Sequence, residues 1–448
     1  MSLGRNSVHK LGKRIRSSYG DGTGKIDDKD LEMLQEYRLS FRDDVASVFN
    51  ILYSISKRVD KYSIVTYRIK RIKSIIEKLK RFPLAGLENF IDIAGCRCIT
   101  ANNDAVYQIV KKLRNNSQLQ INKVKDYIQK PQPEGYQSVH LYVSLKNSGN
   151  NAIEIQIRSR KQHDWATLVE ISDVIVKGAR LKEYSEPHDL LEFHRILSIP
   201  ENQLNDSQRN IYIDTIRNYN YIDLLHSVFI QNIALRYQWI NTSSSALKNF
   251  YLIESALGKE TVIKSFRTFQ EAECAYFDRF KQDFNANLVL TQIPEVTFEQ
   301  LSTAYSNYVL STHNFTTDCL SRCTSEIKSA MIDRDVDRYS KALDLYLNVI
   351  AHLIIRINQE IFSINTTSTL KRNPKHREWT EDLRKQIKQL EARRDKLKYI
   401  YHETRMDEAF FITRYRFQVC NKELSKKYDQ LVKQNIPKHS YIDDNHQV

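Results

Sequence analysis

Three polar side chains of different chemistry follow one another in residues 152–160, which read AIEIQIRSR. Isoleucines alternate there with Glu154, Gln156 and Arg158. Strict alternation predicts a β-strand with one buried face, so the polar side chains emerge together on the other face. A carboxylate in that place can ligate a metal or accept a hydroxyl proton, and an amide can read the edge of a nucleobase. Read together with the segments described next, this face would form one wall of a two-nucleotide site.

A second carboxylate, Asp92, lies in the segment IDIAGCR between two isoleucines that we expect to point into a core. Gly95 permits a bulge, which would bring Arg97 round to the face of Asp92. An acid in such basic surroundings suits a Mg²⁺ ligand beside phosphates. A structural ion pair between Asp92 and Arg97 is the alternative.

Cations suited to phosphates gather around this acid. Between residues 57 and 130 there are 17 Lys and Arg against 6 Asp and Glu, in a chain whose net charge is +14. A helix expected over about 63–81 offers three cations and a hydroxyl, which can hold a triphosphate. These side chains are Arg68, Lys70, Ser74 and Lys78. A solvated basic helix face is the plainer interpretation.

The segment KVKDYIQKPQPEGYQSVH, residues 123–140, is a loop punctuated by Pro and Gly. Gly135 lets the backbone approach a ligand closely, and a tyrosine can stack on a nucleobase. The polar side chains of interest are Lys125, Tyr136, Ser138 and His140. An ordinary hairpin loop with an anchoring tyrosine is the alternative.

Strands that alternate with helices between about 57 and 180 would position these groups in one mixed α/β domain, preceded by a helix over about 28–56. Residues 186–258 have the pattern of helices. A small βαβα unit follows, whose helices begin at Thr268 and Thr297 with capping-box partners three residues later. The remainder is mostly helical, and heptad spacing over 383–401 favours an antiparallel helical hairpin over a dimeric coiled coil.

Bulk composition narrows the class of protein. The chain is 41% hydrophobic and 27% charged, as is usual for a folded globular protein. No apolar run reaches the length of a signal peptide core or a membrane span, so we expect a cytoplasmic protein with no membrane partner. The six cysteines lack zinc-finger spacing.

In combination, four segments resemble the synthetase domain of the RelA/SpoT-type alarmone synthetases. They are YRIKRIKSIIEKL, DIAGCR, KVKDYIQKPQPEGYQSVH and EIQIRSRKQHDWA, and together they cover roughly residues 64–178. That family moves a pyrophosphate group from ATP to the 3′-OH of GDP or GTP with Mg²⁺. The resemblance implies a nucleotidyltransferase-like fold, an α+β mixed sheet flanked by helices.

The resemblance also implies roles for single residues. Asp92 matches the metal ligand, and Glu154 matches the acid that ligates metal or activates the 3′-OH. The ATP-phosphate positions are matched by Arg68, Lys70, Ser74, Lys78 and Arg97. We expect the acceptor nucleotide to be bound by Lys125, Tyr136, Ser138, His140, Gln156 and His163, with Tyr136 stacked on its base.

The expected organisation has four parts. A flexible basic N-terminus occupies 1–27, and a synthetase-like domain with an N-terminal helix occupies 28–180. A helical linker with the small βαβα unit follows over 181–310, and a helical region over 311–448 completes the chain. We expect that last region to bind a protein partner or an antitoxin, and the lack of a His-Asp motif ahead of the match predicts no hydrolase.

Departures from the family pattern leave the acceptor open. Lys123 stands where many members have Arg, and the segment TLVEISD places Glu170 where small synthetases have a His. Some relatives are toxins that pyrophosphorylate the 3′ CCA end of tRNA, so tRNA stays open as a partner beside ATP and GDP or GTP. An adenosine nucleotide also stays open as the acceptor, and so does a non-enzymatic role as a nucleotide- or RNA-binding regulator.

Overall fold

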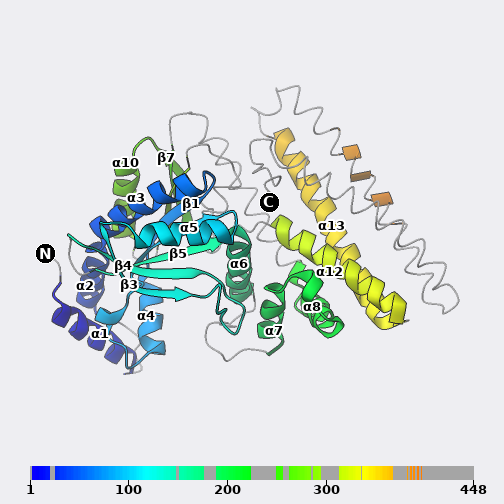
Figure 1. Ribbon diagram of the computed structural model, residues 1–448, viewed down its shortest axis with the longest axis horizontal. Helices are drawn as coiled ribbons and strands as arrows, with labels where there is room; N and C mark the ends of the chain where they lie inside the picture. The colour runs from blue at the N-terminus through cyan, green and yellow to red at the C-terminus, as the bar shows by residue number, and fades with distance from the viewer. Residues whose placement is uncertain are drawn as a thin grey trace. The chain divides into compact units, whose positions relative to one another are not determined.

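A computed structural model gives the fold (Figure 1). It describes residues 3–20, 26–147, 151–175, 188–222, 249–255, 262–283, 286–293, 312–333 and 335–366, with a few positions between 381 and 395. The chain divides into two compact units. The first comprises residues 1–132, 136–163 and 234–306, and the second 133–135, 164–233 and 307–448.

One eight-stranded sheet organises the first unit. In spatial order its strands are β3 (Leu119–Asp126), β4 (Val139–Leu145), β5 (Ile153–Ser159), β2 (Ala94–Thr100), β1 (Ile64–Ile69), β8 (Asn287–Gln292), β6 (Phe250–Ser255) and β7 (Val262–Phe266). Neighbours β2 and β5 are parallel, and the other neighbours are antiparallel. The predicted mixed sheet flanked by helices is confirmed.

Helices α3 (Arg42–Val59), α5 (Asn103–Arg114) and α10 (Phe269–Gln282) cover one face of this sheet (Figure 1). The thiol of Cys96 on β2 points to this face, 3.9 Å from the carbonyl oxygen of Val45. The ring of Phe49 on α3 stacks on Phe269 of α10 with centroids 5.6 Å apart. The alternate apolar side chains of β1, β2 and β5 are buried on this side, which leaves the polar positions between them on the opposite face.

The N-terminal segment differs from the prediction of a loose tail. Residues Arg5–Gly20 form helix α1, and its side chains Val8, Leu11 and Ile15 are buried. Their spacing of three and four residues gives the helix an apolar stripe, which the Gly, Ser and Lys content of the segment obscures. The following helix α2 (Asp28–Leu39) begins at an N-cap, Asp27, whose side chain accepts a hydrogen bond from the N–H of Lys29.

The single helix predicted over 63–81 is wrong. The segment forms strand β1 and then, after a two-residue junction, helix α4 (Ile72–Arg81). The first part of the segment is rich in β-branched and aromatic residues and pairs along its whole length with β2, so strand pairing overrides the helical spacing. Arg68 therefore lies on a strand and Lys70 at the junction.

The small unit expected after the linker is part of the main sheet. The predicted strands within TVIKSF and NLVLTQI are confirmed as β7 and β8, and the capping box at Thr268 is present at the start of α10. Strand β6 falls in a segment predicted to be helical, and it pairs with both β7 and β8. Because β8 pairs with β1, these strands extend the synthetase-like sheet. The helix predicted from Thr297 lies outside the described residues.

The described part of the second unit is helical. It comprises α7 (His188–Leu197), the short η2 (Glu201–Gln203), α8 (Asp206–Asn218), α12 (Thr312–Asp333) and α13 (Val336–Thr366), while α6 (Arg160–Ile175) follows β5 directly. The heptad segment predicted over 383–401 falls mostly outside the described residues. Among the described helices, none is both long and apolar enough to cross a membrane.

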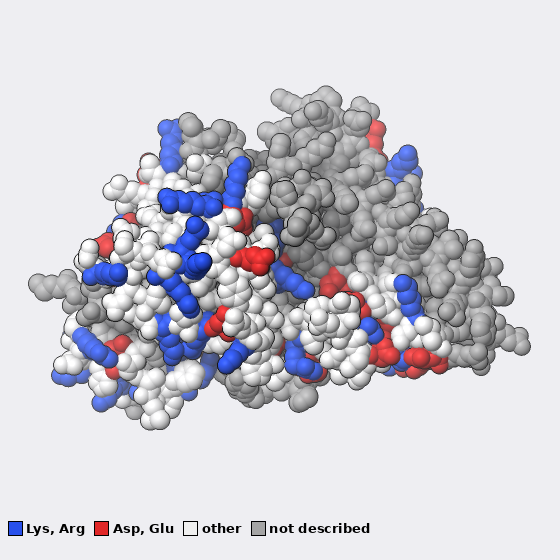
Figure 2. Space-filling view, in the orientation of Figure 1, with Lys and Arg blue, Asp and Glu red and all other residues white. Residues whose placement is uncertain are grey.

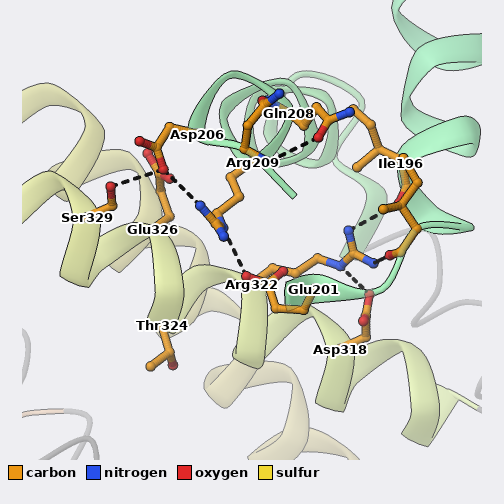
Figure 3. Close-up of polar contacts among 12 residues, drawn as sticks. Ile196, Glu201, Asp206, Gln208, Arg209, Asp318, Arg322, Thr324, Glu326 and Ser329 are labelled. Atoms are coloured by element: carbon orange, nitrogen blue, oxygen red, sulfur yellow. Dashed lines mark hydrogen bonds and ion pairs between the residues drawn. The ribbon is translucent and has the colours of Figure 1, made fainter. Parts of the chain in front are cut away.

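A buried arginine on α12 forms hydrogen bonds with the C-terminal end of α7 in this unit (Figure 3). Arg322 donates to the carbonyl oxygens of Ile196 and Ile199 at 3.3 and 3.0 Å, and to the carboxylate of Asp318 at 2.6 Å. Its guanidinium lies 4.8 Å from the ring centroid of Tyr212. The charge is thus paired and its N–H groups have acceptors, as a buried cation requires.

Candidate active site

The strand register sets the polar side chains in rows across the face opposite α3 and α5. One row runs Lys125, His140, Gln156, Arg97 and Thr66 through β3, β4, β5, β2 and β1. A neighbouring row runs Tyr142, Glu154, Gly95 and Arg68. Cross-strand partners on one face lie about 4.5–5.5 Å apart at their Cβ atoms, so groups far apart in sequence share one small surface.

Asp92 lies in the turn that enters β2, where it meets two cations. Nζ of Lys70 is 2.7 Å from one carboxylate oxygen and Nζ of Lys78 is 2.6 Å from the other. Burial by itself would raise the pKa of Asp92, but the two ammonium charges and their hydrogen bonds lower it below its ordinary value. The acid is therefore held ionised between two lysines of the junction and α4.

The bulge expected at Gly95 is absent, because β2 keeps a regular register with both neighbours there. The glycine instead permits a close approach of strands: an added Cβ would lie 2.9 Å from the carbonyl oxygen of Glu154. Arg97 reaches Gln156, with Nε 3.4 Å from the amide oxygen. The ion pair considered between Asp92 and Arg97 gives way to the pairing of Asp92 with the lysines.

Glu154 ends a chain of three polar groups. Its Oε1 is 3.0 Å from Nδ1 of His140, and Nε2 of the same ring is 2.8 Å from the hydroxyl of Tyr136. The amide of Gln156 donates to Oε2 of Glu154 at 3.0 Å. Burial would raise the pKa of Glu154, but the hydrogen bond and charge of His140 lower it, and the net shift is downward. The nearby charge of Asp92 acts in the opposite direction, which places the two carboxylates within electrostatic reach.

The remaining cations and the hydroxyl predicted to bind the donor or the acceptor lie on β1, α4 and β3. Arg68 is exposed on β1, and Ser74 is half-buried on α4, one turn before Lys78. Lys125 lies on β3 with its ammonium 5.9 Å from the ring centroid of Tyr127. Burial lowers the pKa of Lys70, while Asp92 acts to raise it.

Two residues predicted to bind the acceptor nucleotide, Ser138 and His163, form hydrogen bonds with residues of β5. The buried hydroxyl of Ser138 donates to the carbonyl of Ile157 on β5 at 3.1 Å. The buried ring of His163 has its Nδ1 2.6 Å from a guanidinium nitrogen of Arg158. These contacts tie the β4 entrance and the start of α6 to β5, and a role for Ser138 or His163 in holding a nucleotide stays a prediction.

Two tyrosines belong to the site although the sequence did not single them out. Burial raises the pKa of Tyr142, and the charge of Glu154 and a hydrogen bond to it add to the rise. Tyr127 packs edge-on against the rings of Tyr136 and His140, at 5.9 and 5.2 Å between centroids. Alternation in VHLYVSL could have identified Tyr142, since it shares a strand face with His140.

The donor set suits a magnesium ion. Among the described residues no group of three or more His, Cys, Asp and Glu side chains is arranged to hold a metal by itself. Mg²⁺ is usually bound by one or two carboxylates together with substrate phosphates, and not by an all-protein cage. The carboxylates of Asp92 and Glu154, amid the cations described above, would fit that kind of site.

Comparison with known proteins finds similarity to one family and to two of its GTP pyrophosphokinases. The region found in RelA / SpoT proteins matches residues 67–175. GTP pyrophosphokinase YwaC of Bacillus subtilis is 32% identical over 146 residues, which are 30% of this chain and 70% of that protein. GTP pyrophosphokinase YjbM of the same organism is 30% identical over 153 residues, 32% of this chain and 72% of that protein. Among solved structures, small alarmone synthetase 1 from Bacillus subtilis bound to its product pppGpp is 23% identical, covers 37% of this chain and 94% of its own, and gives a TM-score of 0.31.

Proposed function

Because the chain belongs to the RelA/SpoT family of GTP pyrophosphokinases, we propose that it transfers the β,γ-pyrophosphate of ATP to the 3′-OH of GDP or GTP. The observation that carries this proposal is the pair of carboxylates beside cations: Asp92 lies 2.7 and 2.6 Å from the ammonium groups of Lys70 and Lys78, and Glu154 lies on β5 next to the strand that bears Arg97. Such a transfer needs little covalent chemistry from the protein. It needs two polyphosphates held in line and the developing charge neutralised.

The donor phosphates would meet the cations around Asp92. Lys70 and Lys78 already bind one anion, the carboxylate of Asp92, and their ammonium groups would share their hydrogen bonds with the phosphates of ATP. Arg68 and Arg97 lie on the same polar face, on adjacent strands. Guanidinium groups there can bind phosphate oxygens in a bidentate manner, which fixes the direction of the triphosphate.

Asp92 and Glu154 would hold the Mg²⁺ ion, which when bound neutralises charge on the transferred phosphoryl oxygens. The support is their ionised state and their mutual electrostatic reach. Lys70 and Lys78 would keep Asp92 ionised before any nucleotide arrives. The same two lysines would then balance the charge that ATP brings.

Glu154 would bind the acceptor hydroxyl. A carboxylate can accept about four hydrogen bonds, and His140, Gln156 and Tyr142 supply three, so it can also accept one from a 3′-OH. Because an ionised Glu154 only accepts, Nδ1 of His140 carries the proton of their hydrogen bond. This arrangement orients the carboxylate that takes the proton of the 3′-OH as pyrophosphate is transferred.

A second acceptor, the 3′ CCA end of tRNA, has one supporting observation. In the view of Figure 2, blue Lys and Arg side chains outnumber red Asp and Glu side chains over the part of the first unit that contains β3 to β5 and α5. A concentrated basic surface attracts the phosphate backbone of a nucleic acid. The guanosine nucleotide remains the acceptor that we put first, because the relatives named above are GTP pyrophosphokinases.

The test is an assay with rival acceptors. Purified protein is incubated with Mg²⁺ and ATP labelled in its γ-phosphate, together with GDP, GTP, excess unlabelled ATP or tRNA, and the labelled products are separated by anion exchange. We expect label on GDP or GTP, and none with an Asp92→Asn variant. Absence of product with either guanosine nucleotide, in a sample that binds ATP, contradicts the proposal, and label on tRNA alone favours the second acceptor.

A further inference from the structure

The end of strand β1 is held by a helix far along the chain. Strand β8 pairs with β1 only at Thr66 and Tyr67. The N–H of Ile69, two residues further, donates instead to the hydroxyl of Tyr276 on α10 at 2.9 Å. This bond is buried, and Tyr276 is fully buried in turn. A side-chain hydroxyl thus takes the place of a strand partner where β8 stops pairing.

The next peptide group is fixed as well. The N–H of Lys70 donates to the carbonyl of Ile93 at 2.8 Å, and the carbonyl of Lys70 accepts from Nε of Arg38 at 2.8 Å. Arg38 is buried with its guanidinium 3.9 Å from the ring centroid of Phe280 on α10. Helix α10 therefore supports the junction twice, directly through Tyr276 and indirectly through the ring beneath Arg38.

The junction decides where the Lys70 ammonium can go. Lys70 follows β1 directly, and its Nζ reaches Asp92 at 2.7 Å. A lysine side chain has several rotatable bonds, so a fixed main chain is needed to confine its charge to one place. We infer that Tyr276 is a positioning residue for Lys70. Helix α10 thereby helps to bind ATP, because it fixes the main chain from which the Lys70 ammonium extends. The inference rests on the proposed function, since it takes Lys70 to bind the phosphates of ATP.

Helix α10 lies outside the region that this chain shares with RelA / SpoT proteins, so the proposed role goes beyond that region. The match to the region found in RelA / SpoT proteins ends at residue 175, whereas α10 spans Phe269–Gln282. Without the hydroxyl of Tyr276, the buried N–H of Ile69 would lose its acceptor, and a buried donor without a partner favours a shift of the backbone. A displacement of about 1 Å at a binding group can cost up to about 100-fold in activity.

A matched control stands on the same strand. Tyr67 is buried with its ring centroid 5.4 Å from that of Tyr276, and its hydroxyl makes no hydrogen bond within the described part of the chain. Tyr276→Phe and Tyr67→Phe thus each remove one buried hydroxyl from one aromatic cluster. Only the first removes a bond to the junction.

The experiment measures ATP binding by calorimetry with Mg²⁺, and the KM values for ATP and for the acceptor, in the full chain. We expect Tyr276→Phe to raise the Kd and KM for ATP about three- to tenfold and to leave the acceptor KM unchanged, while Tyr67→Phe changes neither. In a Lys70→Ala background, Tyr276→Phe should add nothing, because both substitutions act on the same contact. Should Tyr276→Phe fail to fold, Arg38→Lys makes the same test through the Lys70 carbonyl.

The outcomes separate the two levels of inference. Wild-type protein that binds no ATP overturns the proposed function and this inference with it. Wild-type protein that binds ATP, with a Tyr276→Phe variant that binds it equally well, overturns this inference alone. A rise in both KM values, or a full additional effect in the Lys70→Ala background, would show a general loss of structure and also overturn it.

Discussion

His140 lies diagonally across from Glu154 on the neighbouring strand, with Nδ1 3.0 Å from the carboxylate oxygen Oε1. The register makes His140 the direct partner of Gln156, and the ring leans along the strand to reach the acid. Diagonal neighbours in a sheet are within reach of long and aromatic side chains. Because an ionised carboxylate only accepts, this contact requires a proton on Nδ1 of the imidazole, and it holds the carboxylate in place.

The first prediction concerns the acid of this pair. Glu154→Gln keeps the shape of the side chain but removes the charge that would accept a proton from the acceptor hydroxyl. We expect kcat to fall by about 10²- to 10⁴-fold, the usual contribution of a general base, and the binding of ATP with Mg²⁺ to weaken as well, because the variant loses a carboxylate that would hold the ion. Steady-state kinetics with a parallel ATP titration measures both. A variant with unchanged kcat would remove Glu154 from the mechanism.

The second prediction concerns pH. The pKa of Asp92 and that of Glu154 are lowered in the folded protein, so both carboxylates release protons more readily there than in the unfolded chain. Their ionised forms thus stabilise the fold above the unfolded values of about 4, and this stabilisation is lost as pH falls through the lower folded values.

Urea unfolding of wild-type protein and of Asp92→Asn between pH 7 and pH 3 tests whether ionised Asp92 stabilises the folded protein. The variant should be less stable at pH 7, because Lys70 and Lys78 lose their shared anion. The difference in unfolding midpoint should shrink as pH falls below about 4, where Asp92 of the unfolded chain takes up its proton first, and it should vanish below the lower pKa of Asp92 in the folded protein. A difference that stays constant over the whole range would contradict the predicted shift.

The third prediction concerns the contact of β2 with β5. Gly95→Ala places a methyl group 2.9 Å from the carbonyl oxygen of Glu154, which is backbone and has no room to rotate away. We expect a loss of about 1–3 kcal/mol in the free energy of unfolding, with a loss of activity from displaced Glu154. Gly4→Ala is the control, since nothing lies within 4 Å of the added methyl. Equal stability of the two variants would mean that the strands separate without cost.

The fourth prediction concerns the second unit. Arg322→Met preserves much of the apolar stem but removes the guanidinium that donates to the carbonyl of Ile199, while the carbonyl of Ile196 keeps the backbone N–H of Ile199 as a donor. We expect the free energy of unfolding of this unit to fall by about 1–3 kcal/mol, the usual cost of a buried acceptor that loses its donor. Lys341→Met, on a more exposed ion pair with Asp337, should change it by less than about 1 kcal/mol. Comparable losses in both would argue against a special role for Arg322.

Much of the site could be predicted from local sequence patterns, because the strands and helices that bear its residues are short and regular. The alternation in β5 correctly indicated that Glu154 and Gln156 share a polar face, and capping-box spacing located the start of α10 at Thr268. What local patterns cannot give is register. That Gln156 lies between Arg97 and His140 depends on hydrogen bonds between strands that are distant in sequence.

Two predictions were wrong because they depended on contacts between segments that are distant in sequence: the helix over 63–81 and the loose N-terminus. Residues 64–69 adjoin the helical spacing of isoleucines in α4, yet pairing with β2 and β8 makes them a strand. The N-terminal helix α1 looked too polar to fold, but its stripe of Val8, Leu11 and Ile15 is buried in the core of the first unit. In both places tertiary contacts, which no short window contains, decided the outcome.

The most direct test of the central claim is to identify both products of one turnover. Protein, Mg²⁺, ATP and GDP are incubated, and the mixture is analysed by mass spectrometry and ³¹P NMR, with Glu154→Gln as the inactive control. Pyrophosphate transfer predicts AMP and a guanosine nucleotide with a 3′-pyrophosphate, formed in equal amounts. Release of ADP in place of AMP, or AMP without a 3′-modified acceptor, would contradict the proposed reaction.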